Sequence, residues 1–267
     1  MLKFPNAKIN IGLNITAKRA DGYHDIESCF YPIPLQDALE VIPSSALKFS
    51  STGIPIPGIQ NDNLVLKAYE LLNADYELTP LEIILHKNIP MGAGMGGGSA
   101  DGAVMLTLLN EYFKLNISNI ELQKYALQLG SDCPFFIENQ PKLVSGRGEV
   151  FGSTSLDLSG YYLALIYPNI HISTAEAYSG IKPTQSKISV KEAVENYQIA
   201  DWKELLKNDF EEGLFVKYPQ LEEIKTRLYN SGAIYASMTG SGSTIFGLFE
   251  STSDHKTVSA FDSWIRL

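Results

Sequence analysis

The sequence predicts an α+β fold, because helical patterns alternate with antiparallel hairpins along the chain. Near the N-terminus, residues 7–15 alternate strictly between apolar and polar side chains, and the turn signal Asp21-Gly22 follows. Further on, the apolar run Ala103–Phe113 is too long for a typical strand and predicts a buried helix. Close to the C-terminus, two short apolar segments flank the loop 239–243 and predict a closing hairpin.

The composition is that of an ordinary folded protein. Hydrophobic residues make up 45% of the chain and charged residues 19%, which disfavours disorder. Acidic side chains outnumber basic ones by 30 to 21, and the net charge of −9 disfavours nucleic acid as a partner, because a duplex selects a basic face. The 267 residues suffice for one large domain or two modest ones. The sequence carries no signal for the oligomeric state.

Cysteine usage and the N-terminal sequence indicate the cellular compartment of the protein. Two cysteines, Cys29 and Cys133, can form neither the disulfide framework of a small secreted domain nor a four-ligand zinc site. The N-terminus lacks the apolar core of a signal peptide, and no apolar stretch reaches the roughly 18 residues of a membrane span. We therefore expect a reduced, cytoplasmic protein with no membrane partner and no metal site built from cysteine or histidine.

The first half of the chain is expected to begin with a hairpin. Lys8 and Asn10 project from the polar face of its first strand, and the apolar residues form the buried face. Ser118-Asn-Ile-Glu121 is a capping box that begins a helix, and Gly130 is its expected end. The other expected elements are strands at 26–33 and 81–86, a helix at 64–72 that Asn63 opens, and the helix 103–113.

The second half is expected to mix helices with a second set of strands. The expected elements are a strand at 161–167, a partly helical region at 184–201, helices near 202–210 and 220–231, and strands at 233–237 and 244–249. Together with the first half, this order indicates a division of the chain near residue 150.

A glycine-rich loop is the strongest local signal for a ligand. Residues 92–97 satisfy G-x-G-x-x-G, but no strand ending in an acidic residue follows, so a dinucleotide fold is disfavoured. A Walker loop is excluded because the chain has no Gly-Lys-Ser/Thr. The loop leads into Ser99 at a helix start, where backbone N–H groups and the helix dipole favour phosphate. The alternative is a flexible connector, and Asp101 is interpreted as stabilising the first helical turn.

Five segments together resemble a known family. The loop Pro90–Ala100 is similar to the phosphate loop of the GHMP kinases, which include galactokinase, homoserine kinase and mevalonate kinase. The segments Pro5–Leu13, Arg19–His24, Gly130–Phe136 and Met238–Ser243 match further motifs of one branch in order and spacing. The resemblance extends from residue 5 to about residue 250.

The resemblance implies a fold, a reaction and ligands. The fold would be two α+β domains, 1–150 and 151–267, with the active site in the cleft between them. The reaction would be ATP-dependent phosphorylation of the 2-hydroxyl of 4-diphosphocytidyl-2-C-methyl-D-erythritol, in non-mevalonate isoprenoid synthesis. The ligands would be ATP, Mg²⁺ and this small cytidine diphosphate substrate. The alternatives are a GHMP kinase of the homoserine or mevalonate type and a catalytically inactive nucleotide-binding module.

Lys8 and Asp132 are the expected catalytic residues. From the residues alone, Lys8 fits a solvated strand edge, and Asp132 fits a helix N-cap before Pro134 at least as well as a catalytic role. The resemblance shifts this balance, because the family's catalytic lysine and aspartate fall on these two positions.

The resemblance also implies two sets of binding residues. Tyr23 and His24 would otherwise be an ordinary exposed pair, Asn63 a helix cap and Lys87 a surface lysine. The ATP-binding residues would be Asn63, Lys87, Pro90, Met91, Gly92, Ala93, Gly94, Met95, Gly96, Gly97, Gly98, Ser99 and Ala100. The substrate-binding residues would be Asn10, Tyr23, His24, Thr174 and Tyr178, with an aromatic ring stacked on the cytosine. No metal ligand is assigned.

Overall fold

The computed structural model describes residues 1–181, 183, 186–250 and 263–267, and these residues form two compact units. The units differ from the expected segments 1–150 and 151–267, because the chain passes between them several times. The reason is a pairing of distant strands: Ser28–Phe30 of the N-terminal hairpin pair with Lys142–Val144. Unit 1 comprises residues 1–8, 34–91 and 96–140, and unit 2 comprises residues 9–33, 92–95 and 141–267.

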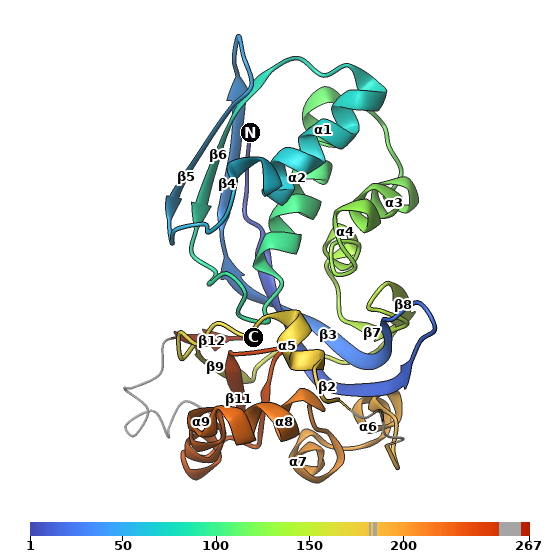
Figure 1. Cartoon of the computed structure of the whole chain (residues 1–267), viewed down its shortest axis with the longest axis vertical. Helices are drawn as coiled ribbons and strands as arrows, with labels where there is room; N and C mark the ends of the chain where they lie inside the picture. The colour runs from blue at the N-terminus through green and yellow to red at the C-terminus, as the bar shows by residue number, and fades with distance from the viewer. Residues whose placement is uncertain (182, 184–185, 251–262) are drawn as a thin grey trace. The chain divides into compact units, whose positions relative to one another are not determined.

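Unit 1 is a sheet with helices on one face (Figure 1). The strands, in spatial order, are β1 (Leu2–Lys3), β4 (Ala38–Pro43), β6 (Leu81–Lys87) and β5 (Lys48–Gly53). β6 pairs antiparallel with β4 and parallel with β5. Alternate residues of β6, such as Ile83 and Leu85, are fully buried, so one face of the sheet forms the core of this unit.

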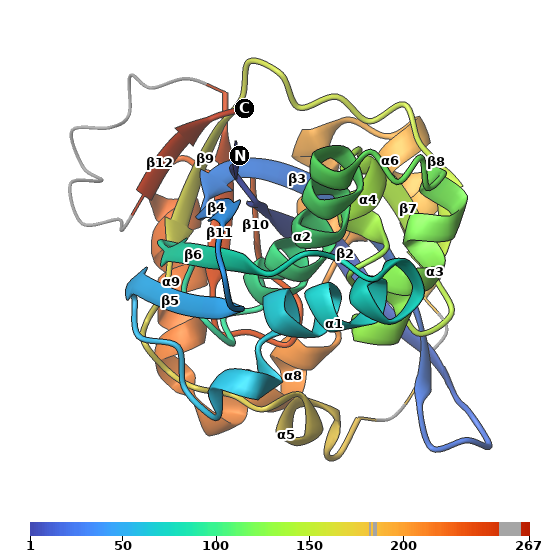
Figure 2. The same cartoon turned by 90° about the horizontal axis from the view of Figure 1, so that it is seen from above.

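The helices of unit 1 carry the predicted capping signals. They are α1 (Leu64–Tyr76), α2 (Gly97–Phe113), α3 (Asn119–Leu129) and α4 (Phe135–Glu138), with a 3₁₀ turn at Gln60–Asp62. The Asn63 side chain accepts the Val65 N–H, and the capping box of Ser118 and Glu121 is present as predicted. α1 and α2 run side by side (Figure 2). α2 begins six residues earlier than the apolar run, because the last glycines of the loop already adopt helical conformation.

Unit 2 contains most of a second sheet and all of a third. The second has the order β2 (Asn6–Lys18), β3 (His24–Gln36), β7 (Lys142–Ser145) and β8 (Val150–Ser153). The third has the order β10 (Tyr235–Met238), β11 (Ile245–Phe249), β9 (Tyr162–Ile166) and β12 (Ser263–Arg266). A buried cluster that includes Leu13, Ala164, Leu221 and Ile245 joins the first strand of one sheet to the other sheet and its helices.

The helices of unit 2 require one correction. They are α5 (Thr174–Tyr178), α6 (Val190–Asn196), α7 (Trp202–Leu205), α8 (Phe210–Lys217) and α9 (Pro219–Asn230), with a 3₁₀ turn at Ile199–Asp201. The single helix predicted at 202–210 is wrong, since residues 206–209 separate α7 from α8. The backbone of Lys207 and Asp209 instead bonds to Leu13 in β2, at 2.9 Å for both hydrogen bonds.

Two further observations concern the sequence predictions. The region predicted as partly helical begins at Thr184, which lies outside the described residues together with residues 182 and 185, and α6 confirms its helical character. Within the described part of the chain, no helix is both long and apolar enough to cross a membrane.

Candidate active site

The two expected catalytic residues lie close together in unit 1. Lys8 is in β2, and Asp132 is in the turn between α3 and α4. The Lys8 Nζ lies 3.9 Å from Asp132 Oδ2; the lysine side chain is 3% exposed and the aspartate side chain 33%. Burial lowers the pKa of Lys8, and the charge of Asp132 partly opposes that shift. The site therefore pairs a desolvated cation with a carboxylate that solvent can reach.

The structural alternatives for these two residues are not supported. A solvated strand edge is wrong for Lys8, because its side chain is buried. A helix cap is wrong for Asp132, because α4 begins after Pro134 and has no side-chain cap.

The glycine-rich loop has residues in both units. Gly92–Met95 belong to unit 2, and Gly96–Gly98 belong to unit 1. Gly96 is the N-cap of α2, so the next residues present backbone N–H groups at the positive end of a 17-residue helix. The Ser99 side chain hydrogen-bonds the Cys133 thiol, whose pKa burial raises to about 12. Backbone donors and the positive end of the helix dipole at this position favour an anion.

A cavity of about 360 Å³ lies next to this helix start in unit 1. Its volume is within the range of small-molecule sites. Of the expected ATP residues, Asn63, Met91 and Gly98 line it. Asp101 lines it as well, although the sequence pattern suggested only a helix-stabilising role. The remaining lining residues are Phe49, Ser50, Ser51, Ile56, Pro57, Gly58, Ile59, Gln60, Asp62 and Leu64.

Lys87 lies in a buried ionic cluster beside the cavity. Its Nζ contacts Asp37 and lies 2.7 Å from Asp101 Oδ2, and all three side chains are at most 4% exposed. The alternative of a surface lysine is therefore wrong, and Lys87 is not among the residues that line the cavity. Its predicted contact with ATP stays a prediction.

With Asp37, Asp101 and Lys87 all ionised, the cluster would hold one more negative than positive charge. Asp37 Oδ1 accepts the backbone N–H groups of Asn88 and Ile89, whereas Asp101 Oδ1 is buried with no hydrogen-bond partner among the described residues. The proton that relieves this imbalance therefore belongs on Asp101. In agreement, burial and the neighbouring Asp37 raise the pKa of Asp101 to about 8, against the opposing effect of Lys87.

The expected substrate residues lie in unit 2. His24 stacks on Tyr178, with ring centroids 4.8 Å apart and planes 22° apart. Tyr23 is exposed, and the guanidinium of Arg147 lies 4.9 Å from its ring centroid. Thr174 is exposed at the start of α5. The sequence analysis did not identify Arg147, because a single arginine in a turn has no distinguishing pattern.

Asn10 is the most buried of the expected substrate residues. Its Nδ2 donates to Ser28 Oγ at 3.0 Å, and its backbone N–H donates to Thr239 Oγ1 at 3.1 Å. Thr239 belongs to the glycine-rich turn after β10, which the sequence analysis used only as a motif. The side chain of Asn10 is thus held in a fixed position by residues of unit 2.

The comparisons with known proteins place the chain in a class. The family model described as "GHMP kinases N terminal domain" matches residues 63–140, and the one described as "GHMP kinases C terminal" matches residues 190–261. A solved phosphomevalonate kinase of Streptococcus pneumoniae, in complex with phosphomevalonate and AMPPNP, has a TM-score of 0.73 at 13% identity, with all of both chains covered. At that identity the likeness concerns the fold alone. The chain has the fold and both domains of the GHMP kinases.

Closer relatives define the family within this class. The 4-diphosphocytidyl-2-C-methyl-D-erythritol kinase of Parabacteroides distasonis is 50% identical, with 98% of this chain and 96% of the relative covered. A crystal structure of 4-(cytidine 5'-diphospho)-2C-methyl-D-erythritol kinase has a TM-score of 0.81 at 29% identity, with 96% of this chain and 92% of that chain covered. The chain belongs to the family of 4-diphosphocytidyl-2-C-methyl-D-erythritol kinases, and the predicted fold class and family are confirmed.

Proposed function

We propose that this protein transfers the γ-phosphoryl group of ATP to the 2-hydroxyl of 4-diphosphocytidyl-2-C-methyl-D-erythritol. The single observation that carries the proposal is the pair Lys8 and Asp132, which the family motifs predict and which lies 3.9 Å apart in the structure. Half of the residues are identical to those of a relative that bears the name of this kinase, over almost the full chain.

Asp132 acts as the general base in the proposed reaction. One Oδ takes the proton of the acceptor hydroxyl as its oxygen bonds to the γ-phosphorus, and the bond from that phosphorus to the β-phosphate oxygen breaks to release ADP. Lys8 stabilises negative charge on the transferring group, and the burial of its side chain strengthens this interaction because solvent screens it less.

ATP is proposed to occupy unit 1. Its base and ribose would lie in the cavity lined by Asn63 and Met91, and its phosphates would bind the N–H groups at the start of α2. Within the described residues, no group of three His, Cys, Asp or Glu side chains could hold a metal ion. Mg²⁺ would therefore be held mostly by phosphate oxygens and water, as is usual for this ion, and would neutralise charge on the transferring phosphate. We assign no protein ligand to it.

The cytidine group is proposed to bind in unit 2. His24 and Tyr178 already form an aromatic surface there, and Tyr23 offers a second, exposed ring. Aromatic faces of this kind bind a base by stacking, and the imidazole nitrogens can hydrogen-bond a base edge. These residues favour a cytidine diphosphate acceptor over mevalonate or homoserine, which have no base to stack.

The proposal is tested by measuring ADP release from ATP and Mg²⁺ with four acceptor conditions. We expect rapid ADP release with the diphosphocytidyl acceptor, and background release with mevalonate, with homoserine and without an acceptor. Identification of the 2-phosphate in the product confirms the position of transfer. Turnover of mevalonate or homoserine at the higher kcat/KM would replace the proposed acceptor, and no turnover with any of them would favour a nucleotide-binding module.

A further inference from the structure

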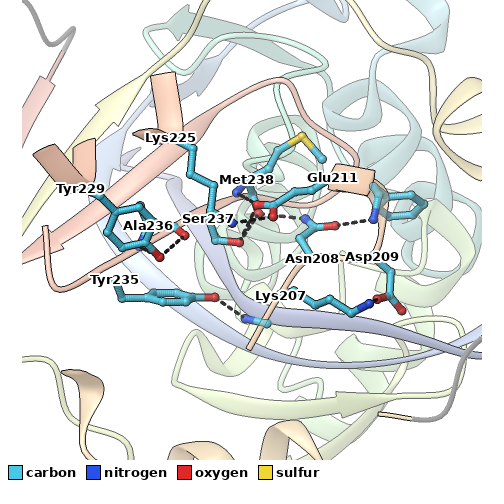
Figure 3. Close-up of polar contacts among 12 residues, drawn as sticks. Lys207, Asn208, Asp209, Glu211, Lys225, Tyr229, Tyr235, Ala236, Ser237 and Met238 are labelled. Carbon is cyan, nitrogen blue, oxygen red and sulfur yellow. Dashed lines mark hydrogen bonds and ion pairs between the residues drawn. The ribbon is translucent and has the colours of Figure 1, made fainter. Parts of the chain in front are cut away.

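Asn208, just before α8, uses its side-chain NH₂ group to bond the end of β10 and the glycine-rich turn that follows it (Figure 3). Its Nδ2 donates to the backbone carbonyls of Met238 and Gly240, at 2.8 Å for both bonds. Its Oδ1 accepts the Phe210 N–H at 3.0 Å, and the residue is 1% exposed. Both amide protons and the amide oxygen are therefore engaged, so a substitution at this position leaves buried polar groups unpaired.

Glu211, in the first turn of α8, bonds the end of β10, directly before the same turn (Figure 3). Its Oε1 accepts the Met238 N–H at 2.8 Å and the Ser237 hydroxyl at 3.2 Å. Its Oε2 accepts from Lys225 Nζ at 2.6 Å, so the buried carboxylate has a counter-ion. The backbone is thus bonded to the start of α8 on both sides of Thr239.

Thr239 joins this turn to two segments of the candidate site. Its Oγ1 accepts the Asn10 N–H at 3.1 Å, and lies 3.2 Å from Asn10 Oδ1 and 3.1 Å from the Gly94 carbonyl oxygen. Gly94 has φ +80°, and a Cβ there would lie 2.0 Å from the Thr239 carbonyl oxygen. The two loops are therefore in direct backbone contact, and a shift of one displaces the other.

We propose that Asn208 is a positioning residue for phosphoryl transfer, which acts through Thr239 on Asn10 and Gly94. This inference rests on the proposed function, in which Asn10 binds the acceptor and Gly94 belongs to the phosphate-binding loop. The turn needs such an anchor because Gly240, at φ +55°, has little intrinsic preference for one conformation. Asn208 donates both amide protons to the carbonyls of Met238 and Gly240, on either side of Thr239. One side chain thereby positions Asn10 on the acceptor side and Gly94 on the nucleotide side.

The test is the nearly isosteric variant Asn208→Asp. Its carboxylate still accepts the Phe210 N–H but presents an oxygen, in place of the amide donor, to the carbonyls of Met238 and Gly240. We expect kcat to fall by about 10- to 100-fold, the range that a misplacement of about 1 Å produces. The dissociation constant for ATP, measured by titration, should rise at least fivefold. As the pH falls, protonation of the new carboxyl restores a donor, so the ratio of variant to wild-type kcat should rise.

Asn110→Asp is the matched control. In unit 1, Asn110 Nδ2 donates to the Ile117 carbonyl at 2.9 Å and its Oδ1 accepts the Ile117 N–H at 3.0 Å, so it secures a loop by the same two kinds of bond. It lies near the C-terminal end of α2, away from the glycine loop. We expect a lower thermal midpoint for this variant, with kcat and the dissociation constant for ATP within twofold of wild type.

Four outcomes are informative. A folded Asn208→Asp protein with kcat and ATP affinity within twofold of wild type, and only a lower midpoint, overturns the inference. If this variant does not fold, Thr239→Val replaces it: loss of activity that Thr239→Ser restores supports the inference, and unchanged activity of Thr239→Val overturns it. If wild type does not phosphorylate the acceptor, the proposed function fails. In that case Asn208 is still a positioning residue for the glycine-rich loop that contains Gly94 if Asn208→Asp weakens ATP binding and Asn110→Asp does not.

Discussion

At the scale of single residues, the contact of Lys8 with Asp132 decides how the site responds to substitution. The lysine is buried and the aspartate is partly exposed, so each partner changes the environment of the other. Removing Asp132 takes away a carboxylate whose charge opposes the effect of burial on Lys8, so the pKa of Lys8 should then fall further.

The first prediction concerns this pair. Asp132→Asn keeps the shape but removes the base, so kcat should fall by roughly 10²–10⁴ with KM for both substrates changed little. Lys8→Met should also lower kcat, and the double variant should lose less than the sum of the two, because the residues act as a unit. Steady-state kinetics on the three purified variants checks this. An Asp132→Asn protein that turns over at the wild-type rate would remove Asp132 as the base.

The second prediction separates the glycines that the fold requires from one that a phosphate requires. A Cβ on Gly94 or Gly97 would clash with the protein itself, at 2.0 Å from Thr239 O and 2.8 Å from Ile89 Cγ2. A Cβ on Gly98 meets only Met91 Cε, at 3.8 Å, and Gly98 lines the cavity. Gly98→Val should therefore fold normally and bind ATP at least about tenfold more weakly, because the side chain obstructs hydrogen bonds to a charged group.

Isothermal titration with ATP measures the effect of Gly98→Val. Gly213→Val is the matched control, because it places the same side chain on a helical glycine of α8 with no atom within 4 Å. ATP affinity that is equal in both variants and in wild type would mean that the loop is a connector and not a phosphate site.

At the scale of elements, strands and helices with a strong pattern could be predicted, and those held by partners could not. The strand at 7–15 and the caps at Asn63 and Ser118 have local signals, and the structure confirms these elements. The single buried face predicted for that strand is wrong, because Lys8, Asn10 and Asn14 on its polar side are buried as well. β5 could not be found in this way, because its residues, Lys48–Gly53, are mostly polar and exposed and depend on pairing with β6. The break between α7 and α8 could not be predicted for the same reason, because the backbone there is hydrogen-bonded to Leu13 in the distant strand β2.

The third prediction concerns the ionic cluster that links the end of β6 to α2. With a pKa of about 8 in the folded protein and 3.8 as the ordinary value, Asp101 holds a proton between these pH values that the unfolded chain releases. Its contribution to the free energy of unfolding is therefore fully present below pH 3.8 and is lost as the pH rises through about 8. Stability should fall from pH 6 to pH 9 in wild type and fall less in Asp101→Asn.

Urea unfolding of both proteins at several pH values tests this prediction. Asp101→Asn carries a neutral side chain of nearly the same shape at every pH, so its free energy of unfolding relative to that of wild type should increase as the pH rises from 6 to about 8. Asp157→Asn serves as a control, because Asp157 is a surface carboxylate whose hydrogen bonds from Ser159 lower its pKa. Parallel curves for wild type and Asp101→Asn would show that Asp101 is ionised throughout this range.

At the scale of the whole molecule, the motifs predicted the family more completely than the patterns predicted the fold. Lys8 and Asp132 lie 124 positions apart in the sequence. Only the resemblance to the family predicted that they belong to one site, and the structure shows that they are in contact. Asn208 and Asp37 could not be found from the sequence, because a buried amide or carboxylate that bonds to distant backbone has no local pattern. The predicted cleft between domains stays a prediction.

The last prediction uses the division of the expected binding residues between the two units. The cavity proposed for ATP belongs to unit 1, whereas Tyr23 lies in unit 2 and is 57% exposed, so its removal should not disturb a core. Loss of a stacked ring costs about 1–3 kcal/mol, so Tyr23→Ala should raise KM for the diphosphocytidyl acceptor by about 5- to 150-fold. KM for ATP should stay within twofold of wild type.

Tyr197→Ala is the control for Tyr23→Ala, since Tyr197 is another exposed tyrosine of unit 2 and is 41% exposed. It should leave both KM values unchanged. The measurement is kcat and KM for each substrate at saturating concentrations of the other. If Tyr23→Ala raises both KM values equally, the Tyr23 ring supports the structure of the protein and does not stack on the cytosine. If it raises neither, the stacked pair of His24 and Tyr178 becomes the better candidate for the base-binding surface, and Tyr178→Leu tests it next, because leucine fills the core-facing side of the position without offering an aromatic face.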